Sequence, residues 1–133
     1  MFAAIKTKAA ACQDRHIGIS PIGSYQPNGY GLFDMLGNVA EWVTDCWHNS
    51  YAGKPLPLYT NGGEAWSTQC EPVRRGEVRI VYGVTRGGSY ETEAEALHVT
   101  ARAKTDPKSL QPTIGFRVVR LLKDRASIGC PSK

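Results

Sequence analysis

Residues 31–42 read Gly-Leu-Phe-Asp-Met-Leu-Gly-Asn-Val-Ala-Glu-Trp, and this stretch decides how the rest of the chain is interpreted. Two acids, Asp34 and Glu41, bracket a glycine turn within it. Carboxylates and backbone carbonyls are the hard oxygen ligands that Ca²⁺ prefers. If the segment is extended, alternate residues point to one side, so the carbonyls of Gly37 and Val39 can converge with both carboxylates. The turn is a candidate cation site. The alternative is that Asp34 caps a turn and Glu41 pairs with an arginine.

The composition bounds the fold and excludes several classes of function. The chain has 133 residues, 41% of them hydrophobic and 21% charged, which suits one domain with a modest core. Fourteen glycines and eight prolines between short apolar runs favour a loop-rich fold with short strands. The net charge is +4, but the basic residues are scattered and lack interleaved aromatics, which disfavours nucleic-acid binding. No apolar run reaches the roughly 18 residues that a membrane span needs.

Two later blocks, Arg86-Gly-Gly-Ser-Tyr90 and Gly115-Phe-Arg117, follow the opening stretch. Together, in this order and register, the three blocks resemble the C-terminal half of a formylglycine-generating-enzyme (sulfatase-modifying-factor) domain over about residues 19–120. The resemblance implies an α+β, C-type-lectin-like fold that is loop-rich with short antiparallel strands. Family domains begin well upstream, so it also implies a fragment, a minimal version or one half of an assembly. We expect a flexible lead-in over 1–18, the domain part over 19–122 and a basic tail over 123–133.

Alternating apolar residues predict several short strands. Residues 19–25 are expected to be extended. The periodicity of residues 38–45 fits a helix and a strand equally well, and the resemblance favours the strand. Residues 78–84, 97–102 and 116–119 each present one apolar face and are expected to pair into a small antiparallel sheet. The family's N-terminal strand is expected beside the last of these. The Phe116 strand should therefore have an open edge, available to a partner chain or to self-association.

The resemblance also bears on metals and catalysis. Matching positions in formylglycine-generating enzymes hold calcium, which implies a structural calcium ion on Asp34, Gly37, Val39 and Glu41. The family's oxidases carry a copper-binding cysteine pair just after Gly-Gly-Ser-Tyr, whereas residues 91–129 here contain no cysteine. That place holds Tyr90, Glu91, Thr92, Glu93 and His98. Carboxylates and a threonine are poor ligands for copper(I), so we expect neither copper nor catalytic residues, and an acidic surface that is either solvated or contacts a ligand.

The leading functional hypothesis is a non-catalytic module of this family that binds a protein or small ligand, or serves a structural role. The alternative is a fragment or subunit of an oxidoreductase, of the formylglycine-generating or non-haem iron sulfoxide synthase type. Arg86, Arg102 and Arg117 could form an anion-binding set, but use as framework is favoured. Ala40 replaces the first tryptophan of the family's Gly-Asn-Val-Trp-Glu-Trp block, which leaves room for a shallow pocket.

Four cysteines are present without a C-x-x-C pair. Related bacterial sequences often place a second cysteine after an Asp-Cys-Trp-His block and a glycine-rich loop, which implies a disulfide between Cys46 and Cys70. Four free thiols in a reducing cytosol are the alternative. A bacterial periplasmic or cell-surface location is favoured, and a cytoplasmic one is left open.

Overall fold

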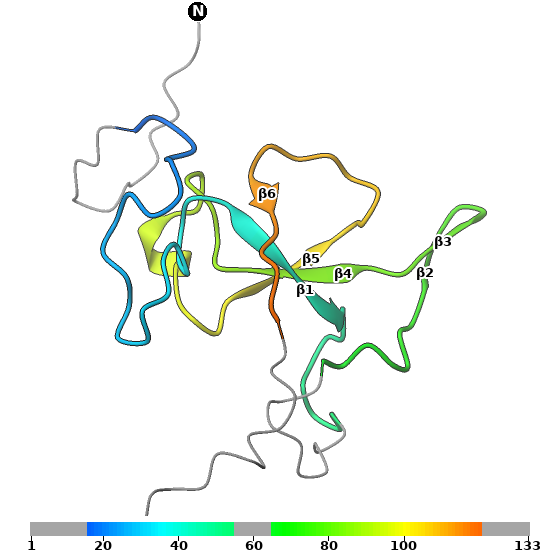
Figure 1. The fold of residues 1–133 in the computed structure, drawn as a ribbon. Helices are drawn as coiled ribbons and strands as arrows, with labels where there is room; N and C mark the ends of the chain where they lie inside the picture. The colour runs from blue at the N-terminus through cyan, green and yellow to red at the C-terminus, as the bar shows by residue number, and fades with distance from the viewer. Residues whose placement is uncertain (1–15, 55–64, 121–133) are drawn as a thin grey trace, which may run out of the picture.

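Short strands separated by long loops make up the part of the chain that the structure describes (Figure 1). The computed structural model describes residues 16–54 and 65–120, so the tail over 123–133 and most of the lead-in lie outside the described residues. The elements, in chain order, are β1 (Ala40–Cys46), β2 (Val73–Arg75), β3 (Val78–Ile80), β4 (Gly83–Arg86), the 3-10 helix η1 (Ala94–Ala96), β5 (Arg102–Thr105) and β6 (Ile114–Gly115).

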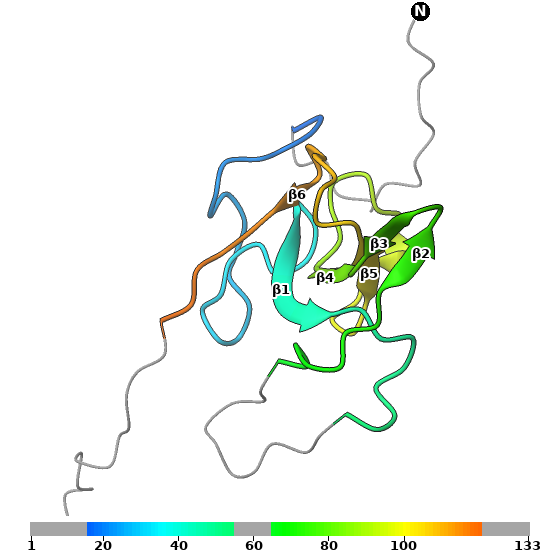
Figure 2. The same cartoon turned by 90° about the vertical axis from the view of Figure 1, so that its right-hand side faces the viewer.

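Four of the strands form one sheet in the order β5-β4-β1-β6. Strand β4 pairs antiparallel with both β1 and β5, whereas β6 pairs parallel with β1. Figure 2 shows β6 and β4 on either side of β1. Val84 and Thr85 of β4 are 1% and 2% exposed, so the core lies at the centre of this sheet. Strands β2 and β3 form a separate hairpin that extends from one side of the sheet (Figure 1).

This architecture agrees with the expected loop-rich fold of short strands, whereas the lectin-like classification stays a prediction. The predicted strand over 38–45 is confirmed, because β1 spans Ala40–Cys46. The described part of the chain has no helix with the length and hydrophobicity that a bilayer crossing requires.

The strand predicted over 78–84 is wrong, because the segment is divided between β3 and β4, which belong to different sheets. The backbone N–H of Trp47 donates to the carbonyl of Tyr82 at 2.8 Å, between the two strands. Directly after this contact, Gly83 packs against the indole of Trp42, where a Cβ would lie 2.7 Å from a ring carbon. Contacts with β1 therefore decide where the strand breaks.

Three other strand predictions are also corrected. Residues 21–24 form a turn, closed by a 3.2 Å bond from the Ser24 N–H to the Pro21 carbonyl. Residues 97–101 follow η1 as irregular chain, and the strand there, β5, begins only at Arg102. The Phe116 strand is absent: β6 ends at Gly115 and runs parallel to β1, and Phe116 is 77% exposed. Apolar residues alternate in the second and third of these segments, but the backbone has no partner strand at those positions.

A disulfide joins Cys46, at the end of β1, to Cys70. The loop that it closes is held by further contacts at its base. The Cys46 N–H donates to the Trp66 carbonyl at 3.1 Å, and the Trp66 N–H donates to the Asp45 carboxylate. The rings of His48 and Trp66 stack at 3.6 Å between centroids, and Trp66 is buried. These contacts pin the base of the loop to the sheet.

Candidate functional site

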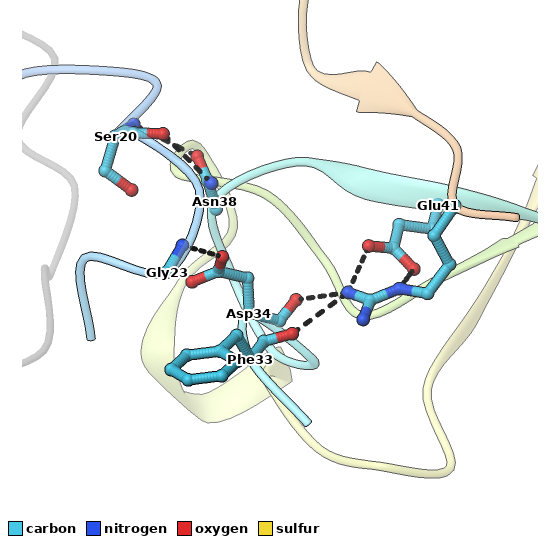
Figure 3. Close-up of polar contacts among 7 residues, drawn as sticks. Ser20, Gly23, Phe33, Asp34, Asn38 and Glu41 are labelled. Carbon is cyan, nitrogen blue, oxygen red and sulfur yellow. Dashed lines mark hydrogen bonds and ion pairs between the residues drawn. The ribbon is translucent and has the colours of Figure 1, made fainter. Parts of the chain in front are cut away.

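The stretch from Asp34 to Glu41 connects three parts of the chain (Figure 3). The Asn38 side chain exchanges two hydrogen bonds with the Ser20 backbone, at 3.1 and 3.2 Å. The Gly37 N–H donates to the Gly87 carbonyl at 2.8 Å, and the Tyr90 N–H donates to the Asn38 carbonyl at 2.9 Å. Gly37 and Asn38 both have positive φ angles, 80° and 58°, which glycine and asparagine tolerate best. The turn chemistry of this stretch thus aligns the first and second sequence blocks.

Arg117, from the third block, lies against the same turn. Its guanidinium donates to both carboxylate oxygens of Glu41, and its Nη2 also donates to the carbonyls of Phe33 and Asp34 at 3.1 and 3.2 Å (Figure 3). The pair is half-buried, with side chains 34% and 20% exposed. The hydrogen bond to Glu41, opposed by partial burial and assisted by the charge of Asp34, raises the pKa of Arg117 above its ordinary value. A positive charge therefore lies among the oxygens of this turn.

The four residues predicted to bind calcium are placed as follows. Asp34 accepts a 2.9 Å hydrogen bond from the Gly23 N–H through Oδ2, while its Oδ1 is buried and has no hydrogen-bond partner among the described residues. The Asp34 carboxylate points toward Gly23 and the Glu41 carboxylate toward Arg117 (Figure 3). Within 16–54 and 65–120, no group of three or more His, Cys, Asp or Glu side chains is arranged to hold a metal. The buried, unpartnered Oδ1 of Asp34 is a suitable ligand for a cation, whereas Glu41 is paired with Arg117. Calcium binding at this turn stays a prediction.

The residues at the family's copper-binding place form a turn that leads into η1. Thr92 accepts a 2.9 Å hydrogen bond from the Ser89 N–H, and the Glu91 N–H donates to the Ser89 hydroxyl at 3.2 Å. Glu91 and Glu93 are exposed, Tyr90 is 36% exposed, and His98 contacts the Thr100 hydroxyl at 2.9 Å. Apart from the bond from the Tyr90 N–H to the Asn38 carbonyl, these polar contacts are local to the turn, and Glu91 and Glu93 lie on the outside, as expected from their type.

A partly open cavity of about 400 Å³ lies behind this turn, over one face of the sheet. Ala40 lines it, in agreement with the expectation that its small side chain leaves a pocket. The uncharged residues that line it include Thr85, Thr92, Ala96, Ala103, Gln111 and Thr113, and the basic residues Arg86, Arg102 and Lys104 line it as well. Beneath it the hydroxyls of Thr85 and Thr105 are hydrogen-bonded at 2.9 Å. Sequence reasoning missed Gln111 and Thr113, because a loop sequence does not indicate the face over which the loop folds.

The comparisons with known proteins agree with the three sequence blocks. Residues 3–122 match the profile of the sulfatase-modifying factor enzyme 1-like domain. The chain is 32% identical over 108 residues to the formylglycine-generating enzyme of Thermomonospora curvata, covering 79% of this chain and 32% of that protein.

Two solved structures are similar in fold. PvdO from Pseudomonas aeruginosa superposes with a TM-score of 0.61 and 34% identity, over 77% of this chain and 34% of that chain. Treponema denticola variable protein 1 gives a TM-score of 0.54 and 26% identity, over 77% of this chain and 32% of the other. The chain thus spans about a third of the length of the proteins it matches. The matched residues include the turn held by Arg117 and the strands around the cavity, and the chain belongs to the family of sulfatase-modifying factor enzyme 1-like domains.

Proposed function

We propose that this chain is a non-catalytic, ligand-binding module of its family. One observation carries the proposal: Thr92 and Ala96, from the segment where the family's oxidases are expected to carry cysteines, line the cavity of about 400 Å³. Small-molecule sites commonly have volumes of about 300–1,000 Å³. Hydroxyl and methyl groups bind ligands by hydrogen bonding and packing, whereas copper(I) requires thiolates.

The lining favours a small ligand with hydrogen-bonding groups, because it combines threonines, alanines and Gln111 with the basic residues Arg86, Arg102 and Lys104. Threonine hydroxyls and the Gln111 amide offer both donors and acceptors, and the alanines offer methyl groups and space. Ala40 lines the cavity together with its register partner Ile114. A bulky side chain at residue 40 should therefore fill the ligand volume without removing a hydrogen bond.

The test compares Ala40→Trp with the unmodified chain in ligand-observed NMR against a library of neutral fragments. Ala52→Trp is the control, because Ala52 is exposed and does not line the cavity. We expect saturable binding that survives Ala52→Trp and is lost in Ala40→Trp, with both variants folded by circular dichroism. Equal fragment binding by Ala40→Trp, or no saturable binding by the unmodified chain, would overturn the proposal.

We also propose that calcium stabilises the turn through Asp34, the carbonyls of Gly37 and Val39, and Glu41. The buried, unpartnered Oδ1 of Asp34 supports this, while the ion would compete with Arg117 for Glu41. Calcium at a hundredfold excess over its dissociation constant should add about 2.7 kcal/mol. Thermal melting in EDTA and in millimolar calcium measures this, with Asp34→Asn as the variant expected to lose the gain. Coincident melting curves for the unmodified chain would show that calcium does not stabilise the turn.

A partner chain, or a second copy, is proposed at the segment after β6. Phe116, Val118 and Val119 are 77%, 87% and 79% exposed. In the described part of the chain, β6 has β1 on one side and no strand on the other. Exposed apolar side chains next to an open strand edge favour pairing with another chain.

The second candidate function is that of an oxidoreductase component, favoured by the 32% identity to a formylglycine-generating enzyme of which the chain covers about a third. Incubation with copper(I), oxygen and a Cys-x-Pro-x-Arg peptide separates the candidates. The binding-module proposal expects an unchanged peptide mass. Oxygen-dependent conversion above a metal-only control would favour the oxidoreductase instead.

A further inference from the structure

Three positive side chains, those of Lys54, Arg86 and Arg102, gather around the ring of Tyr51. Arg86 of β4 and Arg102 of β5 are direct register partners, and Glu41 of β1 is the register partner of Arg86 on its other side. Arg86 and Arg102 also contribute to the lining of the cavity, and alternation along β4 directs the Arg86 side chain to the opposite face of the sheet from the Thr85 side chain. Lys54 approaches the same place from the loop after β1, where its Nζ lies 5.6 Å from the centre of the Tyr51 ring.

The Tyr51 ring is the centre of this cluster, which comprises Lys54, Arg86, Arg102 and Tyr51. The guanidinium of Arg102 lies 4.5 Å from the Tyr51 centroid and 4.3 Å from that of Trp47. The guanidinium of Arg86 lies 5.9 Å from the Tyr51 centroid and donates to its hydroxyl. Aromatic faces attract cations and hold them in place, but they carry no net charge.

The cluster holds an excess of positive charge. Like charges that lie directly opposite each other on neighbouring strands are destabilising, as Arg86 and Arg102 do here. In residues 16–54 and 65–120 the ion pair found is that of Glu41 with Arg117, so no described carboxylate is bonded to the cluster. Arg86 donates a hydrogen bond to the Tyr51 hydroxyl, and Arg102 donates one to the His48 carbonyl at 2.6 Å. A guanidinium has five N–H donors, so both arginines retain donors for a further acceptor.

We infer that this cluster binds a small oxyanion, namely the phosphate or carboxylate group of an anionic ligand. Planar guanidinium groups bind such oxygens in a bidentate manner, and the lysine adds a point charge. The residues that hold the arginines are half-buried or, as with Tyr51 at 38% exposure, open to solvent, so an incoming anion can reach them. A bound oxyanion would relieve the repulsion between Arg86 and Arg102, and unlike chloride it offers two oxygens to one guanidinium.

The test is isothermal titration calorimetry of the whole chain with inorganic phosphate and, separately, acetate, at constant ionic strength set by sodium chloride. Arg86→Gln is expected to weaken binding by about tenfold or more, and Arg86→Lys by less, since lysine keeps the charge but loses the bidentate geometry. The matched control is Arg79→Gln, which removes the same charge from an exposed position on β3.

Saturable heat with phosphate, with acetate or with both supports the site, and the relative affinities identify the group it prefers. Two results would overturn it: no saturable binding of either anion to the unmodified chain, or equal weakening by Arg79→Gln and Arg86→Gln, which would indicate general charge screening. Circular dichroism of each variant shows that a loss of binding does not come from unfolding.

Discussion

Removing the disulfide between Cys46 and Cys70 should have the largest effect on stability of any single change considered for this chain. The two residues are 24 apart in the sequence, and closing a loop of that size stabilises the folded state by about 3.5 kcal/mol in the chain-entropy description. Cys70→Ser is the better variant, because Cys46 is 8% exposed and its replacement would also disturb buried contacts. We therefore expect Cys70→Ser to lower the free energy of unfolding by about 2–4 kcal/mol, which is a large part of the stability of a small domain.

Urea unfolding of oxidised protein, followed by tryptophan fluorescence, measures this difference. Reduction of the unmodified chain should reproduce the loss, whereas Cys130→Ser, which keeps the bridge, should not. Because Tyr51 lies within the closed loop, Cys70→Ser should also weaken oxyanion binding. A free energy of unfolding for Cys70→Ser within about 0.5 kcal/mol of the unmodified oxidised chain would refute the reasoning, as would peptide mapping in which Cys46 and Cys70 are both alkylated after oxidative refolding.

Three further changes test the turn, the sheet edge and the second block. Gly88→Ala should cost about 1–3 kcal/mol in urea unfolding, because Gly88 has a φ of 67° and a Cβ there would lie 2.5 Å from the Leu97 side chain. Glu41→Gln should cost about 1 kcal/mol at low salt, since the pair with Arg117 is partly exposed. The pKa of Arg117 is raised, so its contribution is complete below the unfolded-state pKa and is lost only at strongly alkaline pH; unfolding measured from pH 6 to 9 should show a constant difference. Phe116→Ser should reduce concentration-dependent self-association in light scattering, and a monomeric unmodified chain at high concentration would contradict the open-edge proposal.

The sequence by itself determined the features that depend on residue identity and local spacing. The three blocks identified the family, and the resemblance allowed residues 38–45 to be predicted as a strand where periodicity was ambiguous, in agreement with β1 at Ala40–Cys46. The absence of cysteine from residues 91–129 is likewise a property of the sequence alone. Residue types also predicted that Glu91 and Glu93 would be exposed, since charged side chains are costly to bury.

Only the tertiary structure decided which segments pair and which charges meet. Alternation predicted strands at 78–84 and 116–119, but a strand also needs a partner strand. In the structure, the packing of Gly83 on Trp42 places the start of β4 beside β1, and β6 ends before Phe116. The pairing of Glu41 with Arg117 joins residues 76 apart, and no local pattern could choose that arginine over the others. The physical reason is that local patterns report the preference of a segment for a conformation and a face, whereas strand pairing and ion pairing depend on distant segments that folding alone brings together.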